Sequence, residues 1–160
     1  MPSTSLYYPI LAIPAHQVFS FIIHTYAMRT LQSTGYRINR ANPRAGVTPS
    51  ATQGKVPDAI YQKYQRAKAA ETNLVEYMPV FASAVLASVF ANQATSGDLN
   101  AGGDVTGLTN FIATWYALRV AYVTAYIGTK NAKYATIRSI FWFLSLGLVG
   151  YQFYKVADVL

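Results

Sequence analysis

The chain of 160 residues contains no cysteine, so disulfides, thiolate nucleophiles and cysteine-ligated metals are excluded. Charged residues are also scarce, at 12% of the chain, whereas a typical soluble domain has roughly 25%. The length suits a single domain spanning residues 1–160. So few charges would leave the surface of a soluble domain of this size poorly covered, and the composition therefore points away from one.

Apolar residues make up 52% of the chain and gather in four stretches. We expect helices over residues 6–29, 58–92, 108–129 and 136–156. Each apolar stretch is close to the ~20 residues that a helix needs to cross a bilayer. Lipid offers no hydrogen-bond partners to free backbone groups, which favours helices within the spans. The sequence therefore predicts an all-α membrane protein, a bundle of four transmembrane helices. No basic residue precedes the first stretch, so we expect it to be retained rather than cleaved.

Basic residues are concentrated in two of the three connections. The first holds Arg29, Arg37, Arg40, Arg44, Lys55, Lys63, Arg66 and Lys68, against the single acidic residue Asp58. The third adds Lys130 and Lys133, whereas the second, over residues 93–107, contains two Asp and no basic residue. The positive-inside rule places the basic connections in the cytosol and both termini on the far side. This accounts for most of the net charge of +7 and requires no nucleic-acid partner.

Two polar stripes lie along the expected second and third helices. Arg66, Asn73 and Glu76 recur at spacings of seven and three, which places them on one helical face. On the third helix Arg119, Tyr122 and Tyr126 recur at spacings of three and four, and Trp115 continues that face into the membrane. Arg119 lies within an apolar span and must face protein or water.

Two interpretations of Arg119 stay open at this point. It forms a structural ion pair with Glu76, or both belong to a polar pocket for a charged ligand; the two are compatible. His16 and His24, two turns apart on the first helix, are interpreted as helix-contact or pore-lining residues, since further metal ligands are not evident nearby. Small residues Ala84, Ala87 and Ser88 are expected to allow close helix approach between copies.

The polar segments resemble those of a known family. Residues 66–81, RAKAAETNLVEYMPVF, resemble a signature of the MAPEG family, the membrane-associated proteins of eicosanoid and glutathione metabolism. Residues 119–126, RVAYVTAY, are similar to its second signature, and Arg138-Ser139 resembles the arginine that opens its last helix. The loop over residues 36–44 resembles that of fungal members. This family includes microsomal glutathione transferases and leukotriene C4 synthase.

The resemblance implies a homotrimer of four-helix subunits in the endoplasmic reticulum membrane, with glutathione bound between subunits near the cytosolic face. Arg138 would stabilise the glutathione thiolate, with Tyr126 donating a hydrogen bond. An ungapped count from Tyr126 reaches Lys133 instead, so both remain candidates. Some members carry a basic residue at the positions of Ala69 or Ala70. The remaining glutathione-binding residues implied are Arg29, Arg66, Asn73, Glu76, Tyr77, Arg119 and Tyr122.

Glutathione carries two carboxylates and one ammonium, so its site needs several cations and one carboxylate, which the two stripes offer. A cation within reach of the thiol favours the thiolate. The function expected is a glutathione-dependent transferase or peroxidase acting on lipophilic electrophiles that arrive through the bilayer. Two alternatives stay open: a glutathione-assisted isomerase or other tailoring enzyme of lipophilic metabolites, and a non-catalytic lipid-binding member.

Overall fold

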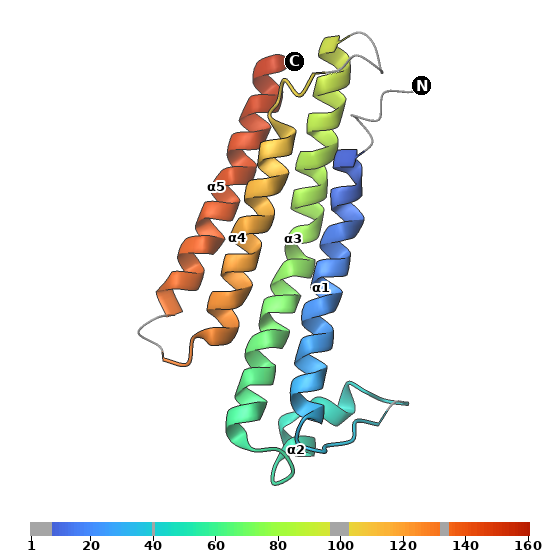
Figure 1. Cartoon of the computed structure of the whole chain (residues 1–160), viewed down its shortest axis with the longest axis vertical. Helices are drawn as coiled ribbons and strands as arrows, with labels where there is room; N and C mark the ends of the chain where they lie inside the picture. Colours follow the sequence, from blue (N-terminus) through green and yellow to red (C-terminus); the bar gives the residue numbers. More distant parts are fainter. Residues whose placement is uncertain (1–7, 40, 97–102, 132–134) are drawn as a thin grey trace.

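The computed structural model describes residues 8–39, 41–96, 103–131 and 135–160, and within them four long helices account for most of the chain (Figure 1). They are α1 (Tyr8–Gln32), α3 (Asp58–Ser96), α4 (Leu108–Gly128) and α5 (Ala135–Val159). The 3₁₀ helix η1 (Ala45–Val47) and the short helix α2 (Pro49–Thr52) lie in the connection between α1 and α3. The predicted all-α, four-helix fold is confirmed, and α3 and α5 each run three or four residues beyond their predicted ends.

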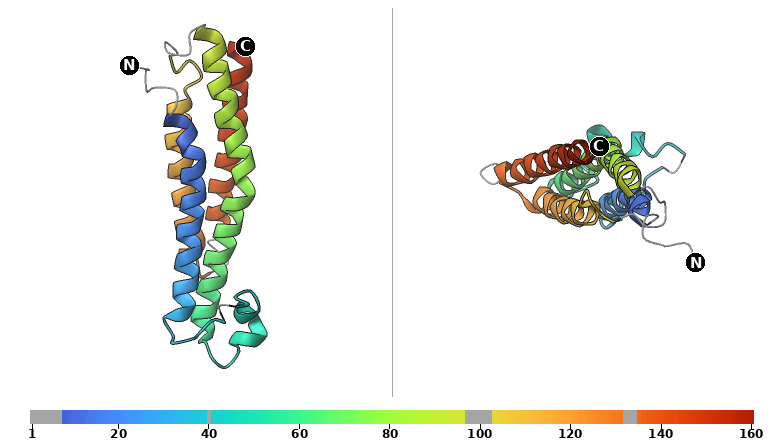
Figure 2. Two further views of the ribbon diagram at one scale, coloured as in Figure 1. Left: turned by 90° about the vertical axis from the view of Figure 1, so that its right-hand side faces the viewer. Right: turned by 90° about the horizontal axis from the view of Figure 1, so that it is seen from above.

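The long helices run alternately up and down, so that α1 begins and α5 ends at one end of the bundle, opposite α2 (Figure 1). Seen from above, α3 lies beside both α1 and α5 (Figure 2). It also packs on α4, which packs on α5, whereas α1 and α4 touch along little of their length. At 39 residues α3 is about 58 Å long. Because the hydrocarbon core is roughly 30 Å thick, α3 extends beyond it.

Three of these helices, α1, α3 and α5, are long and apolar enough by length and composition to cross a membrane. α4 runs alongside them for 21 residues, with a polar face that includes the buried side chain of Arg119. Large apolar side chains cover the outside: Phe21, Phe90 and Phe143 are 65%, 63% and 65% exposed. An extensive exposed apolar surface of this kind is expected where a protein meets lipid.

Stacked aromatic rings form the centre of the bundle. Phe81 of α3 stacks on Trp115 of α4 at 4.9 Å between ring centroids and on Phe111 at 5.9 Å. Ala84 packs in the same core, and Ser88 is also fully buried. The small-residue face of α3 is therefore used largely within the chain, and the expectation that it meets a neighbouring copy is wrong for these two residues.

A polar network joins α3, α5 and the start of α4 at the end opposite α2. Gln152 of α5 donates to the Ser88 hydroxyl at 2.8 Å, and Asn92 Oδ1 accepts from the Thr106 N–H at 3.0 Å. The Asp104 carboxylate accepts from the N–H groups of Leu108 (2.6 Å) and Thr109 (2.8 Å), the first two residues of α4. These contacts occupy free donors at the start of the helix.

Hydrogen bonding controls the ionisation of Asp104. Burial alone would raise its pKa, but bonds from Thr109, Leu108 and Asn92 outweigh it and lower the pKa below the ordinary 3.8. A carboxyl whose pKa is lower in the folded state stabilises the fold above its unfolded pKa, and this contribution is lost as the pH falls through the folded pKa.

We expect Asp104→Ala to destabilise the bundle by roughly 0.5–2 kcal/mol, the usual cost of losing a helix cap. Thermal unfolding in detergent at neutral pH measures this, with Asp158→Ala as the control because Asp158 is exposed near the end of α5. Asp104→Asn keeps one acceptor but should abolish this group's contribution to pH dependence below about pH 4. Equal unfolding midpoints for the Asp104 and Asp158 variants would contradict the assignment.

Candidate functional site

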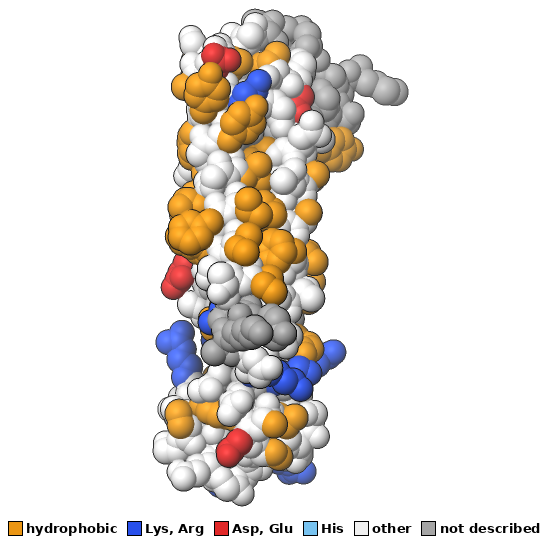
Figure 3. Space-filling view, turned by 90° about the vertical axis from the view of Figure 1, so that its left-hand side faces the viewer, with side chains coloured by type: hydrophobic (Ala, Val, Ile, Leu, Met, Phe, Trp, Pro, Cys, Tyr) orange, Lys and Arg blue, Asp and Glu red, His pale blue; other side chains and the backbone are white. Residues whose placement is uncertain are grey.

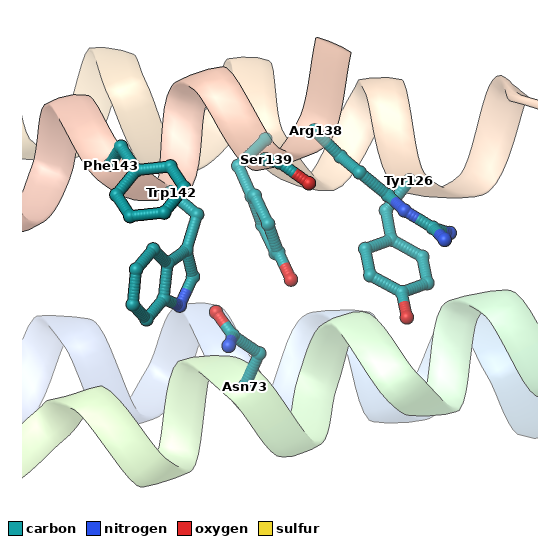
Figure 4. Close-up of a pocket in the computed structure, with 7 residues that line it drawn as sticks. Asn73, Tyr126, Arg138, Ser139, Trp142 and Phe143 are labelled. Atoms are coloured by element: carbon teal, nitrogen blue, oxygen red, sulfur yellow. The ribbon is translucent and has the colours of Figure 1, made fainter. Parts of the chain in front are cut away.

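A cavity of about 270 Å³ opens between α3, α4 and α5, near the end at which α4 stops and α5 starts. Figure 4 shows side chains from these helices converging on it. Its lining residues are Asn73 of α3, Tyr122 and Tyr126 of α4, and Arg138, Ser139, Trp142 and Phe143 of α5. Four residues predicted from separate polar segments, Asn73, Tyr122, Tyr126 and Arg138, therefore meet in one place.

Arg138 and Tyr126 form one side of this cavity. The Arg138 guanidinium carbon lies 4.4 Å from the centroid of the Tyr126 ring (Figure 4). Tyr126 in turn packs at 5.5 Å from Tyr122. A cation over an aromatic face is attracted by the negative charge of the ring face and held in a restricted orientation. The cavity thus has a guanidinium group held in position beside a phenol.

Arg119 lies directly behind the cavity wall, with its side chain fully buried. Its Nη1 donates to Asn73 Oδ1 at 3.1 Å. Three rings surround its guanidinium carbon, with centroids at 4.3 Å for Trp115, 4.4 Å for Tyr77 and 5.8 Å for Tyr122. Nε and Nη2 have no hydrogen-bond partner within the described part of the chain.

The ion pair between Arg119 and Glu76, one of the two interpretations above, does not form between these described residues of one chain. Glu76 is exposed, and the ion pairs formed by the described residues do not include Arg119. Aromatic faces supply the negative potential that a carboxylate would otherwise provide. The physical reason is geometric: the guanidinium is turned towards the interior of the bundle, whereas Glu76 lies on the outer surface of α3.

His16 contacts Trp115, one of the rings that surround the Arg119 guanidinium. The ring is fully buried, with Nε2 3.0 Å from the Leu74 carbonyl oxygen, and Trp115 Nε1 donates to its Nδ1 at 3.4 Å. A neutral ring with its proton on Nε2 satisfies both contacts. The interpretation of His16 as a helix-contact residue is confirmed. His24 is instead half-exposed, beside Lys68 and Glu71.

Of the other predicted site residues, Tyr77 adjoins this cavity, whereas Arg66 and Arg29 do not line it. Tyr77 meets Trp142 edge-on at 5.7 Å and so joins the wall. Arg66 does not reach it, because its Nε donates to the Ile127 carbonyl at 3.1 Å and its side chain lines a separate groove. Arg29 is exposed in the last turn of α1. Lys133 lies outside the described residues.

Sequence reasoning missed Trp142 and Phe143. A signal was available, because Trp142 follows Arg138, and Phe143 follows Ser139, by four residues on α5. Residues four apart lie on one face of a helix. Both residues are uncharged, so the sequence does not distinguish them from the other apolar residues of that span.

The sequence pattern that defines the MAPEG family matches residues 6–157. The chain belongs to the MAPEG family. This family is a helical membrane bundle, and it includes glutathione transferases and related enzymes together with members that are not catalytic. Neither the curated proteins nor the solved structures compared with the chain include a match. The family match and the long apolar helices together identify an integral membrane protein.

Substitutions of Arg119 test how this residue stabilises the wall of the cavity that Arg138 lines. Arg119→Ala should destabilise the protein by about 2 kcal/mol or more, because a buried cation between aromatic faces is lost and Asn73 loses its donor. Arg119→Lys should recover only part of this, since an ammonium lacks the planar group that stacks on Trp115 and Tyr77. Thermal unfolding in detergent should give midpoints that fall in the order wild type, Arg119→Lys, Arg119→Ala. A Lys variant as stable as wild type would show that charge alone matters.

Proposed function

We propose that this protein is a glutathione-dependent membrane transferase or peroxidase that acts on lipophilic electrophiles. The supporting observation is the meeting of Arg138, Tyr126 and Asn73 in one cavity whose α5 side carries the aromatic side chains of Trp142 and Phe143. A charged group and hydrogen-bonding groups suit a polar thiol compound, and the aromatic side suits an apolar reactant. Phe143 is 65% exposed, so this side opens onto the apolar outer surface.

Arg138 is the proposed thiolate stabiliser. Its guanidinium is a planar cation, and its stacking on Tyr126 restricts where the charge can lie. A cation near the sulfur lowers the thiol pKa and raises the fraction of thiolate, which is the nucleophile. The thiol proton leaves to water, and the sulfur then donates an electron pair to the electrophilic carbon, whose leaving group departs with the electrons of the bond that breaks. In the peroxidase reaction the sulfur attacks a peroxide oxygen, the O–O bond breaks to release an alcohol, and a second glutathione reduces the sulfenic acid to the disulfide and water. The Tyr126 hydroxyl, as a donor, would stabilise the same sulfur.

The remaining groups of the proposed site hold the ends of glutathione. Exposed Glu76 is available to the ammonium, and Asn73 to the peptide groups. Arg119 is fully buried, so its proposed role is to orient Asn73 through their hydrogen bond rather than to touch the ligand. The one cationic residue that lines the cavity, Arg138, is the proposed partner of the thiolate, so the two carboxylates of glutathione need further cations. Arg29 and Lys133 are further candidates, and a neighbouring copy would complete the set.

The proposed assembly is a homotrimer with glutathione between copies, in the endoplasmic reticulum membrane with the site facing the cytosol. α3 presents an exposed line of residues to a neighbour, including Glu76, Pro79, Ser83, Leu86 and Phe90. With the small residues Ala84 and Ser88 turned inward, this line is the available contact face of α3.

Arg138→Ala should lower the thiolate signal of bound glutathione at least tenfold at neutral pH, because losing a nearby cation returns the thiol pKa towards about 8.5. Ultraviolet difference absorbance on the detergent-solubilised protein measures the thiolate, and calorimetry measures binding separately. Conjugation of a lipophilic electrophile should fall in parallel. Lys133→Ala is the matched comparison, since it removes a cation five residues earlier in the sequence.

The pattern of loss separates the candidate roles. A full thiolate signal in Arg138→Ala, together with its loss in Lys133→Ala, would transfer the role to Lys133. If glutathione binds but no substitution alters the thiol, the protein is better described as a glutathione-assisted isomerase or a non-catalytic member. Absence of glutathione binding by the wild-type protein would overturn the proposed function itself.

The assembly is testable by disulfide cross-linking, because the chain has no cysteine of its own. Ser83→Cys on the exposed face of α3 should form disulfide-linked pairs of chains under mild oxidation if the α3 helices meet at the centre. Val18→Cys, on an outer face of α1 at 58% exposure, should not. Native mass spectrometry of the wild type should show three copies. A monomer in all mild detergents, or equal cross-linking at both positions, would contradict the trimer.

A further inference from the structure

A second cavity lies on the opposite side of α4 from the Arg138 site. It is a groove of about 610 Å³ between α1, α3 and α4, where α1 and α4 leave space between them. Its lining residues are Ile22, Ile23 and Tyr26 of α1, Lys63 and Arg66 of α3, Val123, Thr124, Ile127 and Gly128 of α4, and Lys130 just beyond α4. None of these residues takes part in the proposed thiolate chemistry.

The groove has an apolar part and a cationic part, ordered along the bundle. Ile22, Ile23 and Val123 lie deeper in the membrane region, because α1 and α4 both run from them towards the end at which α2 lies. Lys63 is near the start of α3, and Lys130 follows the end of α4, so both mark that end. The five residues from Val123 to Gly128, where α4 ends, correspond to roughly 7.5 Å along the axis, and Lys130 lies two residues further on. Figure 3 shows the same order on a neighbouring face, with basic side chains below a mainly hydrophobic region.

The cations of this groove have no acidic partner. None of the described lining residues is acidic. Lys63 Nζ lies 5.4 Å from the centre of the Tyr26 ring, and Arg66 uses Nε on the Ile127 carbonyl while its terminal nitrogens make no hydrogen bond within the described ranges. Such a group of like charges repels itself and attracts an anion.

The nearest ionic cluster is turned away from the groove. Lys68 pairs with Glu71, and His24 lies beside both. These three residues line a different cavity, together with the 43–47 part of the connection after α1. Glu71 therefore does not line the groove with Lys63, Arg66 and Lys130, and the three charges remain for an external anion.

We propose that this groove binds a phospholipid with an anionic headgroup from the cytosolic leaflet. The headgroup phosphate would lie among Lys63, Arg66 and Lys130, and an acyl chain along Ile22, Ile23 and Val123. Basic pockets between transmembrane helices on the cytosolic side suit anionic headgroups. Glutathione fits poorly, because it has no apolar chain for the aliphatic wall. Ile22 is 57% exposed, so the groove is open to a lipid that diffuses in the bilayer.

Native mass spectrometry of the delipidated, intact protein in mild detergent tests this with dioleoyl phosphatidic acid and dioleoyl phosphatidylcholine. Wild-type protein should bind the anionic lipid selectively. Lys63→Gln with Lys130→Gln should weaken that binding at least about tenfold, since each cation near an anionic lipid contributes substantially. The control is Arg37→Gln with Lys55→Gln, which removes two exposed charges outside the groove. Its lipid binding should match wild type.

A second variant addresses the apolar wall without altering charge. Ile22→Trp narrows the groove and should weaken binding of the same phosphatidic acid several-fold, which also covers the case in which the double variant fails to fold. Glycerol phosphate and oleate serve as further probes. Equal loss in the control, equal binding of both phospholipids, tight binding of glycerol phosphate alone, or preference for oleate would each overturn the proposal. Glutathione binding is measured in parallel, so failure here is distinguishable from failure of the proposed function.

Discussion

The contacts of one buried cation, the guanidinium of Arg119, organise the centre of this bundle. A guanidinium placed inside a membrane-spanning helix needs a favourable partner, because lipid provides none. Arg119 finds it in the faces of Trp115 and Tyr77 and in the amide oxygen of Asn73. Through these contacts a single side chain of α4 fixes two residues of α3 on which the Arg138 site depends. The ring that supports Trp115 from α1, His16, extends this arrangement to a third helix.

The two ends of the bundle differ in how their polar and charged side chains are paired. At the end opposite α2, polar side chains satisfy one another: Gln152 bonds Ser88, and Asp104 caps α4. Groups that are hydrogen-bonded to one another in this way make the fold more rigid and are occupied within the protein. At the other end the cations Arg138, Lys63 and Lys130 are left without a carboxylate in the cavities that they line. Unpaired charge in a cavity is available to a ligand, which is why both proposed sites lie in this half of the molecule.

α4 separates two environments that differ in chemistry. On the α5 side, Arg138 shares a cavity with a phenol, an amide and an indole, which suits a polar ligand that must be oriented. On the α1 side, Ile22 and Val123 form an aliphatic wall deeper in the membrane region than the basic residues, which suits an amphiphile. The side chains of Arg66 and Asn73 illustrate the division, because they come from the same helix and point into different cavities. Loose packing between α1 and α4 leaves the second cavity open.

Much of the fold was determined by the sequence alone, since apolar stretches of bilayer length and the charges between them depend on local composition. The four helices followed from this. Helical spacing marked Asn73, Tyr122 and Tyr126 as candidate residues, and the resemblance to the MAPEG family marked Arg138. Only the tertiary structure decided which of them meet. Helical spacing placed Arg66 with Asn73 and suggested Glu76 as the partner of Arg119, because it describes directions on one helix and not the helices packed against it. The hydrogen bond of Arg66 to the Ile127 carbonyl, the inward turn of Arg119 and the ring faces around it became visible only when α1, α3, α4 and α5 were assembled. Aromatic partners carry no charge to mark them in a sequence, and so Trp142 and the rings around Arg119 had to be found in space.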